Sequence, residues 1–80
     1  MANLDIYDQL TKIFREVFHL QEITLFPAMT ANDLDGWDSF KQVEIILQVE
    51  EAFRISLNSR EMDGIRNVGH LADIIASKLS

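Results

Sequence analysis

The residue of this sequence with the clearest chemical potential is Ser39. The chain contains no cysteine, which excludes disulfides, thiolate nucleophiles and cysteine-ligated zinc sites. Ser39 follows Asp38, a good helix cap, where polar loop residues give way to a helical pattern. Unpaired amides and the macrodipole at a helix N-terminus favour negative charge, so the Ser39 hydroxyl is a plausible site for a phosphate ester. The same two residues also suit an ordinary helix start, and local sequence alone leaves both interpretations open.

Other kinds of chemistry find little support in the residues. A serine esterase would need a base beside Ser39, and the histidines of the chain are His19 and His70. Ser39 lacks the flanking glycines of a nucleophile elbow, so catalysis is not expected. Two histidines are too few for a histidine-rich metal site. A calcium loop with Gly36 at its sixth position would lack carboxylates at its first and twelfth positions. No catalytic residue and no metal ligand are therefore predicted.

Hydrophobic periodicity predicts a helix on each side of a long loop. Between Leu4 and about His19, apolar residues recur at intervals of three and four, which is typical of an amphipathic helix. A second helix, capped by Asp38, should run from Ser39 to about Phe53. The residues expected on its broad apolar face are Phe40, Val43, Ile46, Leu47 and Phe53.

The loop itself, residues 20–37, loses the helical period and carries turn-forming residues. Its large apolar side chains would be costly to leave in water, so the loop is expected to pack back over the helices and to be ordered. These apolar loop residues are Ile23, Leu25, Phe26, Met29, Leu34 and Trp37.

The rest of the chain indicates a short helix and a longer final one. Asn58 begins a capping-box-like stretch whose short helix should end near Gly64. Asn67 can cap a last helix over 68–79. Because amphipathic helices bury their apolar stripes only against one another, the sequence predicts an all-α fold. We expect a small four-helix bundle, with three longer helices, a short third helix and a long first loop, formed by a single domain over residues 1–80.

The net negative charge of the chain limits the kinds of partner that it can bind. Thirteen acidic and seven basic residues give a net charge of −6, which would repel nucleic acids and anionic lipids and favour basic protein surfaces. No apolar run approaches the length of a membrane span, and the N-terminus lacks the order of a secretory signal. We therefore expect a cytoplasmic protein without nucleic-acid or membrane binding. No sustained heptad seam is present, which predicts a monomer.

The residues around Ser39 form a longer pattern with those at the end of the predicted second helix. The pattern consists of Gly36-Trp37-Asp38-Ser39-Phe40, the following Val43-Glu44, and residues 50–57, Glu-Glu-Ala-Phe-Arg-Ile-Ser-Leu. It resembles the acyl carrier protein family, including the related peptidyl carrier domains. In that family a Gly-x-Asp-Ser-Leu motif opens the second helix, which runs into a Glu-Glu-x-Phe-x-Ile-x-Leu type ending. Phe40 replaces the usual leucine, and Lys41 adds a positive charge where partner contacts are expected, so both bear on which enzymes dock.

The resemblance implies a prosthetic group on Ser39. In that family a phosphopantetheinyl transferase uses coenzyme A and magnesium to esterify the serine, which leaves a flexible phosphopantetheine arm with a terminal thiol. The arm would supply the thiol that this sequence lacks. The implied function is to hold acyl or aminoacyl intermediates as thioesters and to shuttle them between enzymes of fatty-acid, polyketide or related biosynthesis. Such a carrier is not an enzyme but a substrate of acyl-loading, synthase and acyltransferase enzymes with basic docking patches.

The resemblance also implies roles for residues near Ser39. Those implied in partner recognition are Asp38, Phe40, Glu44, Glu50 and Glu51, although exposed acidic residues also suit an ordinary solvated helix face. Four apolar residues could line an acyl cleft between helices or belong to the core: Val43, Leu47, Ile65 and Leu71. The alternative to the whole interpretation is an unmodified acidic helical interaction module, in which the second helix binds a partner and Ser39 is only a helix start.

Overall fold

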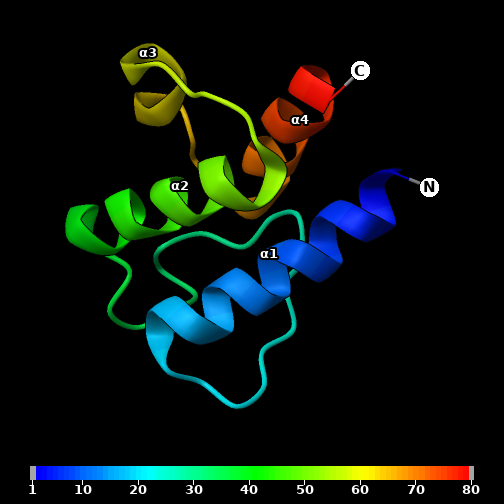
Figure 1. Ribbon diagram of the computed structural model, residues 1–80. Helices are drawn as coiled ribbons and strands as arrows, with labels where there is room; N and C mark the ends of the chain where they lie inside the picture. Colours follow the sequence, from blue (N-terminus) through cyan, green and yellow to red (C-terminus); the bar gives the residue numbers. More distant parts are fainter. Residues whose placement is uncertain (1, 80) are drawn as a thin grey trace.

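The computed structural model of the chain describes residues 2–79, and every regular element in that range is a helix. In chain order these are α1 (Ala2–Phe18), α2 (Ser39–Phe53), α3 (Ser59–Asp63) and α4 (Val68–Leu79). In Figure 1, α1, α2 and α4 surround a common centre, and the short α3 lies at one edge, away from α1. The predicted all-α bundle, with three longer helices, a short third helix and a long first loop, is confirmed.

Hydrogen bonds from side chains to the backbone begin three of these helices, as predicted. The carboxylate of Asp38 accepts from the backbone N–H of Lys41 at 2.9 Å at the start of α2. Asn58 and Glu61 form a reciprocal capping box at the start of α3. The Oδ1 atom of Asn67 accepts from the backbone N–H of the third residue of α4 at 2.7 Å. Each bond satisfies an amide that has no partner within its own helix, which fixes where the helix starts.

The first helix differs slightly from the prediction at both ends. It begins at Ala2, two residues earlier than predicted, and it ends at Phe18, one residue before the predicted end. His19 has a φ of 54°, a left-handed conformation that cannot continue a right-handed helix. The backbone N–H of Leu20 donates to the carbonyl of Arg15 at 2.9 Å, so the helix ends in a Schellman-type turn.

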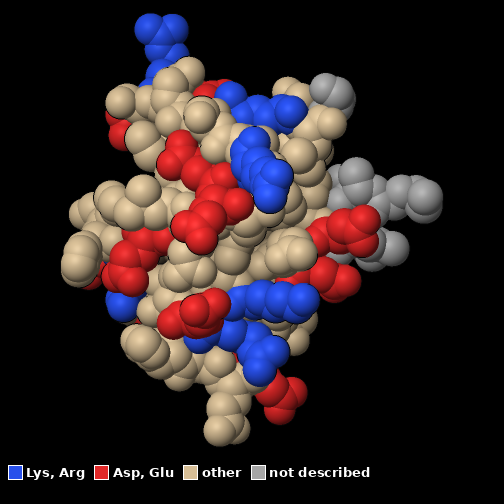
Figure 2. All heavy atoms as spheres, viewed as in Figure 1, with Lys and Arg blue, Asp and Glu red and all other residues tan. Residues whose placement is uncertain are grey.

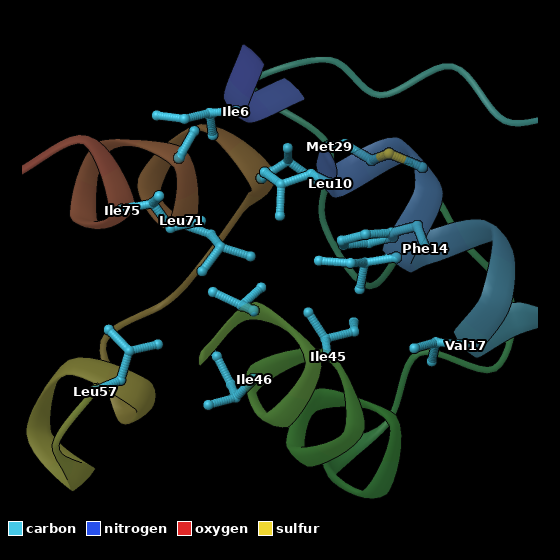
Figure 3. Close-up of a cluster of buried hydrophobic side chains, with 14 residues drawn as sticks. Ile6, Leu10, Phe14, Val17, Met29, Ile45, Ile46, Leu57, Leu71 and Ile75 are labelled. Atoms are coloured by element: carbon cyan, nitrogen blue, oxygen red, sulfur yellow. The ribbon is translucent and has the colours of Figure 1, made fainter. Parts of the chain in front are cut away.

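Apolar side chains from α1, α2 and α4 form the core (Figure 3). Phe14, Ile45 and Ile75, one from each of these helices, are completely buried. The core residues are Ile6, Leu10, Ile13, Phe14, Val17, Met29, Ile45, Ile46, Val49, Leu57, Val68, Leu71, Ala72 and Ile75. Truncating a buried leucine or isoleucine to alanine typically costs about 2–5 kcal/mol. This cluster therefore holds α2, and with it the start of α2, in a fixed place on α1.

The face of α2 that packs on the core is only in part the predicted one, because Ile46 is buried and Phe53 packs against the core. Phe40, Val43 and Leu47 are 70%, 53% and 60% exposed, so their predicted place on a buried face is wrong. The side of α2 that is buried carries Ile45, Ile46 and Val49; Ile46 belongs to the predicted face, whereas Ile45 and Val49 do not. Because apolar residues occur on both sides of this helix, their periodicity alone does not distinguish the core face from the outer face.

The loop between α1 and α2 packs back over the bundle, as predicted. Met29 is buried in the core, and its carbonyl accepts from the N–H of Val68 at 2.9 Å. The carbonyl of Pro27 accepts from the N–H of Gly69 at 2.8 Å, so the loop satisfies the first amides of α4. A β-carbon at Gly69 would lie 2.9 Å from the Pro27 oxygen, and glycine therefore permits this close approach. Phe26 departs from the prediction, because it is 43% exposed.

Candidate functional site

Ser39 is the first residue of α2 and is exposed. Asp38 precedes it in an extended conformation, with φ −114° and ψ −173°, and its carboxylate caps the helix. The backbone carbonyl of Asp38 accepts from the N–H of Gln42 at 2.9 Å, the first bond of the helical ladder. The Ser39 hydroxyl therefore belongs to the exposed N-terminus of a well-formed helix, where a modifying enzyme can reach it and where negative charge is favoured.

The turn that leads into α2 depends on Gly36. This residue has a φ of +87°, a backbone conformation that residues with a β-carbon rarely adopt. Its carbonyl accepts from the N–H of Asp38 at 3.0 Å. Apart from its chain neighbours, no atom of the described residues lies within 4 Å of the position that a β-carbon would take. Glycine is therefore favoured here by backbone conformation and not by lack of space.

Trp37 fixes the start of α2 against α1. Its ring meets Phe14 edge to face, with centroids 5.3 Å apart and planes at 85°, and it lies 6.4 Å from the ring of Phe18. The indole N–H donates to the Oε1 atom of Gln42 at 2.8 Å. Residues on both sides of Ser39 are thus tied together and to α1, so the serine is presented from an anchored position.

A hollow of about 240 Å³ lies directly beside Ser39, which we call the Ser39 hollow. Its walls come from the first loop, the start of α2 and the connection between α3 and α4. The residues that line it are Ala31, Trp37, Asp38, Ser39, Gln42, Ile65 and Arg66. Gln42 and Arg66 could not be assigned to the site from the sequence, because neither belongs to a local motif and only the tertiary fold brings Arg66 to the same hollow as Ser39.

Acidic side chains gather over α2 on the face seen in Figure 2, with basic side chains below them over α1. Glu51 is exposed, and the Oε1 atom of Glu44 lies 3.6 Å from the Nζ atom of Lys41. That Nζ atom also donates to the carbonyl of Val17 at 3.1 Å, near the C-terminal end of α1, where the helix dipole favours a cation. The charge of Lys41 is therefore largely engaged within the molecule, and the outer face of α2 keeps an acidic character.

Glu50 has a structural contact of its own. It is half-buried, and its Oε2 atom accepts from the backbone N–H of Leu57 at 2.8 Å. Its carbonyl accepts from the N–H of Ile55 at 3.2 Å, next to the left-handed residue Arg54, which has a φ of 57°. Glu50 thus holds the turn by which the chain leaves α2. A part for Glu50 in partner recognition stays a prediction.

Comparisons with known proteins bear on this arrangement. Residues 8–75 match the family described as "Phosphopantetheine attachment site". The solution structure of the holo acyl carrier protein from Geobacter metallireducens is similar, with a TM-score of 0.85. The two chains are 39% identical, over 92% of this chain and 85% of that one. This chain belongs to the acyl carrier protein family. It has the fold of an acyl carrier protein, and phosphopantetheine is its prosthetic group.

The surroundings of Ser39 in this carrier protein suit a phosphopantetheine group. An exposed hydroxyl at a helix N-terminus can be esterified without disturbing the core, and the helix favours the charge of the phosphate. The carboxylate of Asp38 is already engaged as the helix cap. The guanidinium-bearing residue Arg66 lines the hollow beside the hydroxyl. The residues present therefore fit the group.

The four residues predicted for an acyl cleft of this carrier do not share one surface. Val43 and Leu47 are exposed on the outer side of α2, whereas Leu71 is buried in the core. Ile65 is half-buried and lines the Ser39 hollow. They are separated because α2 turns the side that carries Ile45 inward, and the predicted cleft residues of α2 lie on the other side. A cleft lined by all four stays a prediction.

The remaining candidates lie elsewhere on the carrier. His19 follows the end of α1 and His70 lies in the first turn of α4, and both are exposed. Within residues 2–79, no three or more histidine, aspartate or glutamate side chains are grouped so that they could hold a metal ion. No helix in the same range is long and apolar enough to span a membrane.

Proposed function

We propose that this protein carries acyl intermediates as thioesters on a phosphopantetheine arm attached to Ser39. The observation that carries the proposal is the exposed position of Ser39 at the start of α2 in a chain of the acyl carrier family. The serine oxygen would attack the phosphorus of coenzyme A that bears the pantetheine, with loss of the hydroxyl proton. A phosphodiester forms, and the adenosine bisphosphate leaves. The chain is then the substrate of a transferase and later of enzymes in fatty-acid, polyketide or related biosynthesis.

The outer face of α2 supports docking to those enzymes. Phe40, Val43 and Leu47 are exposed on it, directly after Ser39, and Glu44 and Glu51 lie on the same side. Exposed apolar side chains rimmed by acidic ones suit an enzyme surface with an apolar patch and a basic rim. A small contact of this kind forms and breaks quickly, as a shuttle requires.

The proposal can be tested by intact-mass spectrometry. The protein is incubated with coenzyme A, magnesium and a broad-specificity phosphopantetheinyl transferase, and we expect the mass of one phosphopantetheine to be added. Ser39→Ala should abolish the adduct while leaving the helical content unchanged. Ser59→Ala is the matched control, because Ser59 is also the exposed first residue of a helix. An adduct that persists on Ser39→Ala would move the site elsewhere.

The second candidate function is an unmodified interaction module. It is favoured by the exposed apolar residues of α2, which could bind a partner without any prosthetic group. Absence of an adduct on the unaltered protein, under conditions in which a known carrier is modified, would favour this function over the first.

A further inference from the structure

The Ser39 hollow is lined in part by a basic residue, Arg66, that forms no ion pair among residues 2–79. Arg66 is exposed and lines the hollow together with Ser39. In the described part of the chain, ion pairs join Lys41 to Glu44 within α2 and join α3 to α4, and Arg66 takes part in neither. Lys41, the basic residue nearest in sequence to Ser39, is engaged on the α1 side of α2. Arg66 is therefore the cation available to a negatively charged group in this hollow.

The other residues that line the hollow provide hydrogen-bond donors of fixed orientation and apolar surface. An indole N–H can only donate a hydrogen bond, so the bond from Trp37 sets the amide of Gln42 with its oxygen toward the indole. The two N–H donors of that amide remain for another acceptor. Ile65 and Trp37, which also line the hollow, are apolar residues. The hollow thus combines one cation, oriented donors and an apolar wall.

We propose that Arg66 holds the phosphodiester of the phosphopantetheine arm in the Ser39 hollow; this inference rests on the attachment of the arm to Ser39 proposed above. The phosphodiester keeps one negative charge next to the carboxylate of Asp38, and the guanidinium of Arg66 offsets the repulsion between them. A tether to Ser39 keeps the phosphate beside Arg66 at high effective concentration, so even an exposed pair forms.

The size of the hollow limits what it holds. At about 240 Å³ it is smaller than ordinary small-molecule pockets, which are roughly 300–1,000 Å³. A volume of this size suits the phosphate and the adjoining dimethyl-bearing segment of the arm, to which Ile65 and Trp37 would offer apolar surface. The thiol end would stay outside, free to accept and deliver acyl groups.

The test compares unmodified and modified forms of four proteins: the unaltered chain, Arg66→Gln, Arg66→Lys and Arg60→Gln. Arg60 is the matched control, because it is an exposed arginine on α3 that neither lines the hollow nor forms an ion pair among residues 2–79. Intact mass confirms each modified form. The readouts are the melting temperature, the phosphorus NMR shift and proton contacts between the arm and the ring of Trp37.

For the unaltered chain and Arg60→Gln we expect the same change in melting temperature on modification. For Arg66→Gln, the melting temperature of the modified form minus that of the unmodified form should be about 2–4 °C smaller than for the unaltered chain. This is the effect expected of an exposed ion pair in a domain of this length. The difference should vanish near 1 M salt, where the screening length is about 3 Å. Arg66→Lys keeps the charge but not the planar fork, so its change in melting temperature should lie between those of the unaltered chain and Arg66→Gln.

Two kinds of failure are distinguishable. If no protein gains an adduct, the attachment to Ser39 fails and this inference fails with it. If the adducts form but Arg66→Gln behaves as Arg60→Gln does, with the same phosphorus shift and no contacts from the arm to Trp37, the attachment stands and the role of Arg66 is refuted.

Discussion

Gly69→Ala should destabilise the protein, because the first loop packs directly against this position of α4. A β-carbon there would lie 2.9 Å from the Pro27 oxygen, 3.0 Å from its Cβ and 3.2 Å from its Cα. These are mostly backbone atoms, or atoms bound to the backbone, so the loop itself must move to relieve the contact. Such a movement weakens the hydrogen bonds from Gly69 to Pro27 and from Val68 to Met29.

The expected magnitude follows from opposing effects. Overpacking at a tight contact costs typically about 1–3 kcal/mol, and each weakened backbone hydrogen bond contributes up to about 1 kcal/mol more. The higher helix propensity of alanine, compared with glycine, raises the unfolding free energy by up to about 1 kcal/mol. The net loss should be about 2 kcal/mol, which lowers the melting temperature of a domain of this size by roughly 8–16 °C.

The assay is thermal and urea unfolding followed by far-ultraviolet circular dichroism. Gly64→Ala is the matched control, since the nearest atom to its added β-carbon lies at 3.4 Å and its φ of −85° suits alanine. We expect the unfolding free energy of that control to lie within about 1 kcal/mol of the value for the unaltered protein. If Gly69→Ala were as stable as Gly64→Ala, the close packing of the loop on α4 would be refuted.

Four further predictions follow from other contacts. Glu50→Ala should lower the unfolding free energy by about 1–3 kcal/mol, because it leaves a backbone amide after α2 without its acceptor; the exposed control Glu51→Ala should change it by less than about 0.5 kcal/mol in the same urea titration. The hydrogen bond from the N-cap backbone of α3, and the side-chain contact with α4, hold the pKa of Glu61 below its usual 4.5. A lowered pKa in the folded state contributes stability that is present above pH 4.5 and is lost as the pH falls through the lowered value. Glu61→Gln should therefore make the unfolding free energy depend less on pH below about pH 4.5. An unchanged pH dependence in that range would contradict this. Leu47→Asp should leave the melting temperature within a few degrees, because Leu47 is exposed, while weakening the transfer of the arm or acyl group by a docking enzyme; a cooperative loss of folding would show that its outer position is wrong. Light scattering at rising concentration should give the mass of a monomer throughout, since no helix carries a long heptad seam, and a stable dimer would count against this.

The helix starts could be predicted from the sequence because their causes are local. Asp38, Asn58 and Asn67 each bond to a backbone amide three residues further on, and such bonds depend on residue type and spacing alone. The position of Ser39 at the first residue of α2 follows from the same motif. The existence of the long, packed loop could also be predicted, because its apolar side chains had to be covered.

What could not be predicted depends on contacts between distant segments. The apolar residues on both sides of α2 gave no means of choosing the core face, and the choice is made by the complementary surfaces of α1 and α4. The bond between Glu50 and the amide of Leu57 appears only once the chain has turned after α2. Arg66 comes to the Ser39 hollow from the connection between α3 and α4, far along the chain. Residue types predict the acidic helix and the exposed serine, whereas tertiary contacts determine which residues surround them.

The packing of Trp37 has a practical consequence. It is the single tryptophan of the chain, two residues before Ser39. Its ring packs against the rings of Phe14 and Phe18, and the residue also lines the Ser39 hollow. Its fluorescence therefore arises from one place, with no other indole to dilute the signal. The emission of this ring should respond to events at the serine and to the separation of α1 from α2. The protein thus carries its own optical reporter beside the serine that we propose as the attachment point of the arm.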